Sequence, residues 1–141
     1  MTDRLPGDVI GLLRDAREVD IETRPAPDVP PHRTTIWVVV DDQGRAFIRT
    51  YRGPGSRWYR EATAAPAVAL LSQGQRIEVA LEPATDPERV EACSQALRTK
   101  YAGAGGLRGM LAAENIPTTL ELVPVPPEPP TGSDVVYSPS G

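Results

Sequence analysis

The sequence contains very little cysteine and histidine, and this scarcity excludes several classes of site. Its 141 residues include one cysteine, Cys93, and one histidine, His32. No disulfide can form within the chain, and the usual nitrogen and sulfur ligands of a structural zinc or iron site are missing. Asp41 and Asp42 are adjacent, but they stand in an expected hairpin turn, where such residues commonly serve the turn geometry. We therefore predict no metal site.

The same scarcity argues against a hydrolase. A Ser-His-Asp arrangement would have to use His32, which lies in the proline-rich segment 25–33, and no nucleophile-elbow motif is present. We expect His32 to be solvated or bonded within its loop.

Long apolar segments are also lacking. The apolar run at 36–40 is far shorter than the roughly 20 residues that a membrane-spanning helix needs, and no amphipathic stretch is rich in basic residues. No N-terminal segment combines basic residues with an apolar stretch as a secretory signal would. We expect a cytoplasmic protein without a membrane role.

The charge is acidic overall but unevenly spread. The net charge of −4 argues against a general nucleic-acid binder, because such proteins neutralise phosphates. The window 45–60 nevertheless has five arginines and no acidic residue, so it carries +5 and the remainder −9. Lys100 is the only lysine among fifteen basic residues, so the use of arginine in this window is not by itself evidence for bidentate recognition.

Hydrophobic patterning predicts five or six strands with helices between them. The strands are expected near 18–24, 34–40, 46–51, 68–72, 75–83 and 118–123. The segment TTIWVVV (34–40) is apolar on both faces, so both should be covered. In AFIRTY, alternation places Arg49 on one face with Phe47 and Tyr51. Antiparallel hairpins interleaved with helices favour an α+β barrel or half-open sheet.

Helices are expected at 8–16, 56–64, 86–101 and, in a short form, around 107–111. Asp86 and Pro87 form an N-cap and N1 pair, and Ser56 precedes the second helix as an N-cap. On one stripe of the helix 86–101, Cys93 should behave as a small core residue. The predicted domain comprises residues 1–123, followed by a proline-rich tail, 124–141, that is extended or disordered.

The motif RTYRGPGSRWYR (49–60) is the strongest candidate site. Its glycine-proline-glycine bend allows the backbone to approach a ligand, and the helix after Ser56 presents unpaired N–H groups and a partial positive charge. Surrounding arginines would complete a pocket for a phosphate or another anion. The alternative is a solvated turn whose arginines pair with acids elsewhere. Trp58 either packs inward or stacks on a flat ligand, whereas Trp37 is expected in the core.

The order TTIWVVVDD, turn, FIRTYRGPGSRWYR, short helix and VALL resembles the flavin and deazaflavin oxidoreductase superfamily of pyridoxamine-5′-phosphate-oxidase-like proteins. Within it, the "IWVVVD" and "GRWYR"-like motifs are similar to a bacterial branch of unassigned function. The resemblance covers about residues 17–123. It implies a six-stranded antiparallel split β-barrel (the FMN-binding split barrel) with short flanking helices, and a homodimer that holds FMN or the deazaflavin coenzyme F-420 in an interface groove.

The resemblance also implies which residues hold the cofactor. Family members commonly use the basic residue of the strand and the serine and basic residues at the following helix start. The implied cofactor-binding residues are Arg49, Thr50, Arg52, Gly55, Ser56, Arg57, Trp58 and Arg60, of which Arg52 and Arg60 fit on charge alone. The chain departs from F-420-using relatives, which often carry a lysine where Arg57 stands, and its bend is unusually tight for the family.

Three functions follow for comparison. The first is an oxidoreductase in which the cofactor exchanges hydride with a small organic substrate and a protein acid, Tyr51 or Tyr101, completes protonation. The second is a non-catalytic protein that binds a cofactor, haem or an anionic ligand on the same fold. The third is a scaffold whose proline-rich tail docks a partner as polyproline II.

Deletion of residues 124–141 should leave the melting temperature unchanged, because the tail has too little apolar surface to contribute to a core. Thermal unfolding of the truncated and full-length chains followed by circular dichroism tests this. A clear drop in the melting temperature would show that the tail packs on the domain. If the scaffold function is right, the truncated chain also loses its partner.

Overall fold

The computed structural model describes residues 4–126, so the predicted tail lies almost entirely outside the described residues. The elements, in chain order, are α1 (Gly7–Asp15), β1 (Val19–Thr23), β2 (His32–Ile36), β3 (Val39–Val40), β4 (Ala46–Ile48), α2 (Arg57–Ala64), β5 (Ala67–Ser72), β6 (Gln75–Pro83), α3 (Pro87–Lys100), α4 (Leu107–Met110), a 3-10 turn (Ile116–Thr118) and β7 (Leu120–Val123). Each predicted helix is present within one or two residues. Within the described range, no helix is both long and apolar enough to cross a bilayer.

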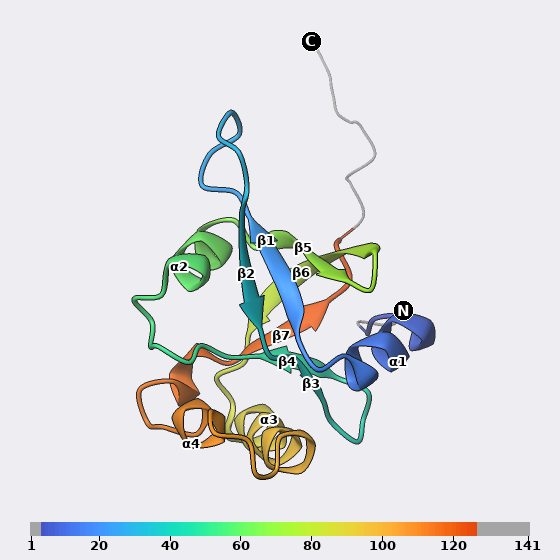
Figure 1. The fold of residues 1–141 in the computed structure, drawn as a ribbon, viewed down its shortest axis with the longest axis vertical. Helices are drawn as coiled ribbons and strands as arrows, with labels where there is room; N and C mark the ends of the chain where they lie inside the picture. Colours follow the sequence, from blue (N-terminus) through green and yellow to red (C-terminus); the bar gives the residue numbers. More distant parts are fainter. Residues whose placement is uncertain (1–3, 127–141) are drawn as a thin grey trace.

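The strands form one curled antiparallel sheet with the order β2-β1-β5-β6-β7-β4-β3 (Figure 1). The two edge strands, β2 and β3, are consecutive in the chain and are joined by two residues only, so the sheet must curl until its edges meet. This is an α+β fold with a split barrel, as predicted. The predicted number of six strands is wrong, because the sheet has seven.

The additional strand arises from a break in the segment TTIWVVV. β2 pairs with β1, whereas β3 pairs with β4 at the opposite edge of the sheet. At the break, the carbonyl of Val38 accepts a hydrogen bond from Lys100 Nζ at 2.7 Å. The Tyr101 hydroxyl donates to the carbonyl of Arg17 at 2.7 Å and shares the same proton more weakly with Val38 at 3.3 Å. The Trp37 ring stacks on Tyr101 with 3.8 Å between ring centroids. In a continuous strand, a neighbouring strand would donate a hydrogen bond to the Val38 carbonyl. Here the end of α3 provides the donors instead, so the apolar run can divide into two strands.

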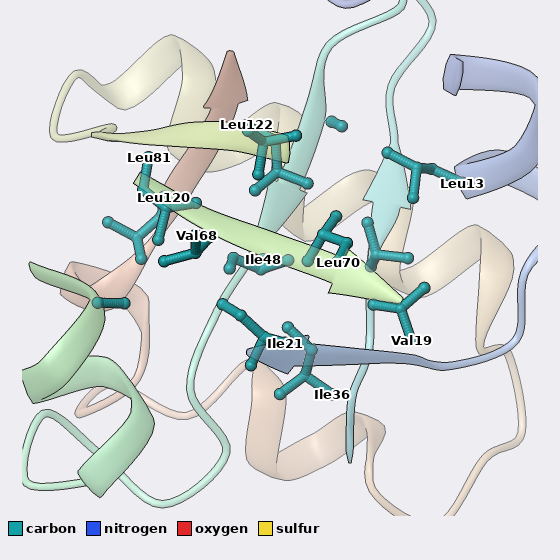
Figure 2. Packing of buried hydrophobic residues seen from close by; sticks show 14 of the residues in the cluster. Leu13, Val19, Ile21, Ile36, Ile48, Val68, Leu70, Leu81, Leu120 and Leu122 are labelled. Atoms are coloured by element: carbon teal, nitrogen blue, oxygen red, sulfur yellow. The ribbon is translucent and has the colours of Figure 1, made fainter. Parts of the chain in front are cut away.

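Two apolar cores lie on the two sides of the sheet. Inside the barrel, side chains from the surrounding strands point toward one another, among them Ile21, Ile48 and Leu70 (Figure 2). Outside, α3 and α4 cover the β3–β4 hairpin with a second cluster that includes Phe47 and Cys93. Ile48 faces inward and Phe47 outward, as the predicted alternation requires. Cys93 is fully buried, as predicted for a core residue, and burial raises the pKa of its thiol to about 12.

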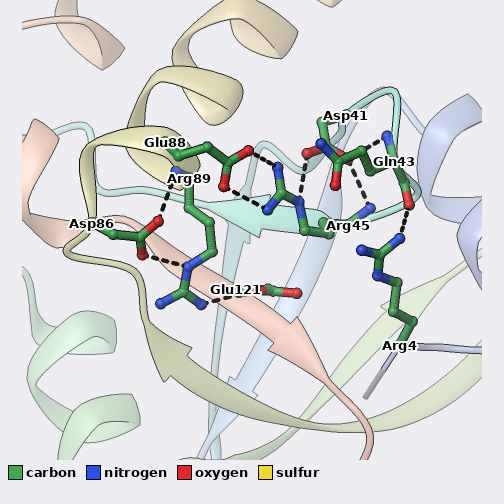
Figure 3. A network of polar contacts seen from close by, with 8 residues as sticks. All are labelled: Arg4, Asp41, Gln43, Arg45, Asp86, Glu88, Arg89 and Glu121. Carbon is green, nitrogen blue, oxygen red and sulfur yellow. Dashed lines mark hydrogen bonds and ion pairs between the residues drawn. The ribbon is translucent and has the colours of Figure 1, made fainter. Parts of the chain in front are cut away.

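A charged network fastens α3 to the sheet (Figure 3). Arg45 Nε donates to Asp41 at 2.8 Å, and its terminal nitrogens donate to Glu88 at 2.9 and 2.6 Å. Asp41 also accepts from the backbone N–H groups of Gln43 and Arg45, which confirms its predicted role in the turn. Nearby, Arg89 pairs with three carboxylates, those of Asp86, Glu82 and Glu121.

The break at Val38 also gives the chain's only lysine an unusual environment. Burial, assisted by nearby Arg17, lowers the pKa of Lys100 to about 8. Acetylation requires the neutral amine, so the reaction rate of Lys100 with acetic anhydride should reach half its maximum near pH 8 in the folded protein and near the ordinary lysine value in concentrated urea. Peptide mass spectrometry reports this single site. Identical midpoints in the two states would contradict the buried geometry.

Candidate functional site

A pocket of about 710 Å³ lies between β2, the segment that leads from β4 into α2, and α4. Figure 1 shows that segment passing along one side of the molecule between α2 and α4. The volume is in the range of pockets that hold drug-sized or cofactor-sized ligands. Its lining residues are Glu18, Thr34, Thr35, Ile36, Trp37, Arg49, Tyr51, Arg52, Gly55, Ser56, Arg57, Trp58, Gly106 and Met110.

Six of the eight predicted site residues line this pocket: Arg49, Arg52, Gly55, Ser56, Arg57 and Trp58. The other two do not. Thr50 is fully buried, and its hydroxyl bonds Asn115 at 2.8 Å and Thr118 at 2.9 Å. Arg60 is exposed and donates to the carbonyl of Gly55 at 3.1 Å. These two residues shape the backbone around the pocket and do not reach into it.

The bend before α2 leaves the start of that helix open toward the pocket. Gly53 has a φ of +87°, which favours glycine. Ser56 occupies the N-cap position, but its hydroxyl donates backward to the carbonyl of Gly53 at 2.8 Å and caps no helix N–H. The first turn also contains no acidic residue. The positive end of the α2 dipole therefore lacks a side-chain acceptor where Gly55, Ser56 and Arg57 line the pocket.

The arginines at this bend differ from those elsewhere in the chain. Arg45, also in the basic window, is held by two carboxylates. The side chains of Arg52 and Arg57, in contrast, make no hydrogen bond or ion pair with any residue in the range 4–126, although the charge of Arg57 helps to lower the pKa of Glu61. The alternative interpretation of residues 45–60 is a solvated turn whose arginines pair with acids elsewhere. Pairing with acids holds for Arg45 but not for Arg52 and Arg57, which line the pocket.

Arg49 is the most unusual residue of the pocket wall. Its side chain is 1% exposed, and it donates to Thr119 Oγ1 at 2.8 Å, Ser94 Oγ at 3.1 Å, Met110 O at 3.1 Å and Val90 O at 3.2 Å. All four acceptors are neutral, and burial lowers the pKa of the guanidinium. One of its five N–H groups has no partner among the described residues. The pocket wall thus contains a buried positive charge without a bonded carboxylate.

Aromatic rings form another part of the wall. Trp37 was expected in the core but is only half-buried, and it contributes to the pocket. Tyr51 is 54% exposed and lies against α4, where a Cβ on Gly109 would overlap its ring. Trp58 packs into the barrel core and still lines the pocket, so both interpretations of this residue hold in part. In the segment GGLRG (105–109), Gly106 and Gly109 lie against the rings of Trp37 and Tyr51. Glycines at this spacing are a weak sequence signal for such close packing.

The prediction that His32 is solvated or bonded within its loop is wrong. His32 is the first residue of β2 and lies opposite Thr23 of β1. Its Nδ1 is 2.9 Å from Glu61 Oε2 on α2. The loop 24–31 is shorter than expected because strand pairing begins at His32, directly after the last proline.

Comparison with known proteins supports the fold. The bacterial family DUF2255, described as "uncharacterized protein conserved in bacteria", matches residues 10–122. No curated protein sequence matches the chain.

Several solved structures share the fold at low sequence identity. A pyridoxamine 5′-phosphate oxidase-like protein from Listeria innocua is 12% identical, with a TM-score of 0.55 over 86% of this chain and 92% of the other. An F-420-H2-dependent reductase is 14% identical, with a TM-score of 0.55 over 75% and 93%. HutZ, a haem storage protein from Vibrio cholerae, is 12% identical, with a TM-score of 0.57 over 88% and 92%. The predicted resemblance is confirmed at the level of the split-barrel fold.

Arg49→Lys should lower the free energy of unfolding by more than about 2 kcal/mol. An ammonium group has three donors and cannot reach four acceptors spread over α3, α4 and Thr119, the residue before β7, so buried polar atoms lose their partners. Urea denaturation measures the change. Arg52→Lys is the matched control and should unfold like the wild type. Equal stability of the two variants would show that Arg49 is not a structural clamp.

Proposed function

The chain belongs to the bacterial family DUF2255, and we propose that it is an oxidoreductase-type protein that binds a phosphate-bearing flavin or deazaflavin in this pocket. The cofactor is FMN or F-420, and hydride passes to or from a small organic substrate. The shared fold with an F-420-H2-dependent reductase and a pyridoxamine 5′-phosphate oxidase-like protein supports this proposal. Fold alone does not define the reaction, so the proposal depends on the pocket residues.

One observation carries the proposal. Arg52 and Arg57 lie on the same pocket as the uncapped start of α2, and neither is paired with a carboxylate in the described chain. Arg49 adds a buried positive charge to the wall. A helix N-terminus together with guanidinium groups that have no carboxylate partner in the described chain suits a phosphate, which is negatively charged and accepts several hydrogen bonds. These residues fit the phosphate group of either cofactor.

Each residue then has a distinct role. Arg52, Arg57 and the first N–H groups of α2 would hold the phosphate. Arg49 would supply charge and at most one hydrogen bond, because its other donors are occupied. Trp37 and Tyr51 would border a flat ring system. When bound, a flavin or deazaflavin supplies the hydride chemistry, and the protein provides orientation and charge.

The structure separates the two tyrosines considered as proton donors. The Tyr101 hydroxyl donates to the carbonyl of Arg17 at 2.7 Å, and its side chain is fully buried behind Trp37. Burial raises the pKa of Tyr101 to about 12. Tyr51 lines the pocket and makes no side-chain hydrogen bond with the described residues. We assign Tyr51 as the tyrosine that could protonate a bound substrate.

The proposal includes a homodimer, as the family resemblance implies. In this proposal, a second copy would complete the groove beside Tyr51 and Arg52, which are both exposed and line the pocket. The homodimer and the choice between FMN and F-420 are both part of the proposal.

Titration of the purified protein with FMN and with F-420, followed by cofactor fluorescence, tests the proposal. We expect saturable binding of one of them at micromolar concentration. Arg52→Ala and Arg57→Ala should each weaken binding by more than about 1.5 kcal/mol, roughly tenfold or more, through the loss of charge-assisted contacts to phosphate.

Arg24→Ala is the matched control, because Arg24 is an exposed arginine that donates to the carbonyl of Val29 in its own loop and lies outside the pocket lining. It should bind the cofactor like the wild type. Unchanged affinity in both Arg52 and Arg57 variants would mean that the anion site lies elsewhere. A failure of both cofactors to bind would refute the proposed oxidoreductase.

A non-catalytic binding protein is the second candidate, and the shared fold with a haem storage protein favours it. In that case the same pocket residues would bind an anionic ligand without catalysing a reaction. Haem iron also needs an axial ligand, and the pocket lining contains Met110 and Tyr51 but no histidine or cysteine. A haem titration followed by visible absorbance separates this candidate from the first.

A further inference from the structure

Three side chains from three elements converge beside the pocket. Thr23 ends β1, His32 begins β2, and the two residues are direct partners in the antiparallel ladder. Glu61, in the middle of α2, accepts a hydrogen bond from Thr23 Oγ1 at 2.7 Å, and both of its oxygens lie about 3 Å from His32 Nδ1, at 3.0 and 2.9 Å. The His32–Glu61 pair thus attaches α2 to the edge of the sheet, where Figure 1 shows α2 beside β2.

The hydrogen bonding determines where the histidine proton lies. Burial alone would raise the pKa of Glu61, but its hydrogen bonds with Thr23 and His32 outweigh burial and lower it, so Glu61 is a carboxylate at neutral pH. A carboxylate only accepts, so Nδ1 of His32 carries a proton in both charge states of the ring. Protonation therefore occurs at Nε2, and the His32 side chain is 34% exposed.

The pair is connected to the anion site through one turn of helix. Glu61 and Arg57 are four residues apart on α2 and therefore share a face, and Arg57 also acts electrostatically on Glu61. On β2, His32 and Thr34 share a face, and Thr34 lines the pocket. The carboxylate of Glu61 thus partly offsets the positive charge of the phosphate site.

We propose that the His32–Glu61 pair positions the start of α2 and couples anion binding in the pocket to protonation of His32, an inference that rests on the proposed phosphate site. When His32 is neutral, the uncompensated Glu61 carboxylate weakens the positive field at Arg57. When His32 is protonated, the pair is electrically neutral, and the field at Arg57 acts fully on the ligand. Anion binding is therefore tighter when His32 is protonated than when it is neutral.

The surrounding charges are consistent with this assignment. On α2, the charged groups that act on the pair are Glu61 itself and Arg57. On β1, the neighbour is Thr23, which does not titrate, and Glu22 is held by Arg33 and Arg76. On β2, Arg33 follows His32 and, by alternation, faces away from it. Among the described residues, Glu61 is thus the carboxylate that bonds His32.

Because His32 is the only histidine, its imidazole C2–H proton signal in an NMR spectrum is uniquely assigned. The experiment measures the pKa of His32 from this signal with and without saturating FMN, or F-420 if that is the cofactor that binds. By reciprocal linkage, the bound anion should raise the pKa by about 0.5, which equals about threefold tighter binding to the protonated protein. A merely structural role for the pair predicts no change.

Two variants separate the pair's charge from its hydrogen bonds. His32→Asn places an amide N–H near the position of Nδ1 but has no titrating group. The variant should therefore lack the increase in anion affinity that the wild type shows at low pH with the same ligand. Glu61→Gln should bind the anion about threefold more tightly at pH 8, because the opposing charge is gone. Glu78→Gln removes an exposed carboxylate on β6 that does not line the pocket and should change neither property.

The outcomes are distinct for the two proposals. Saturable cofactor binding with an unchanged His32 pKa overturns this inference and leaves the phosphate site intact. Weaker binding by Glu61→Gln at pH 8, with an unchanged melting temperature, also overturns it. If neither cofactor binds to the wild type, both proposals fail.

Discussion

The hydrogen bonds that α3 donates to the carbonyl of Val38 are the constraint on which the rest of this structure depends. Lys100 satisfies that carbonyl where the chain passes from β2 to β3, with a weaker shared hydrogen bond from Tyr101, and this makes a break in an otherwise continuous β pattern energetically acceptable. The break sends β2 and β3 to opposite edges of the sheet, and their short connection curls the sheet into a split barrel. It also turns Trp37 onto Tyr101 and toward the pocket.

The pocket combines a rigid wall with an open, positively charged end. Arg49 fastens α3, α4 and the start of β7 to β4, and its burial without a carboxylate leaves a net positive charge at the wall. The guanidinium groups of Arg52 and Arg57, on the bend and the first turn of α2, make no hydrogen bond or ion pair within residues 4–126. A buried clamp and exposed ligand-binding groups thus come from one short arginine-rich motif, because alternation directs its residues to different environments.

Local pattern explains what could be predicted from the residues. Asp86 and Pro87 begin α3, and the Asp86 side chain accepts from the N–H of Arg89 as an N-cap. The alternation in 75–83 and the inward Ile48 with outward Phe47 also agree with the structure. The family resemblance identified the split barrel, and six of the eight residues predicted for the site line one pocket. The N-cap, the strand alternation and the arginine-rich motif could be recognised because each is formed by residues that are close together in the sequence.

What required the tertiary structure involves partners distant in the sequence. The break at Val38 depends on Lys100, the burial of Arg49 depends on Ser94 and Thr119, and the role of His32 depends on Glu61. The sequence by itself determined the element types, the basic bend and the scarcity of metal ligands, because these follow from backbone preferences and composition. Only the folded chain decided which arginines are paired, because the pairing of a charge depends on which distant groups the fold brings within hydrogen-bond distance.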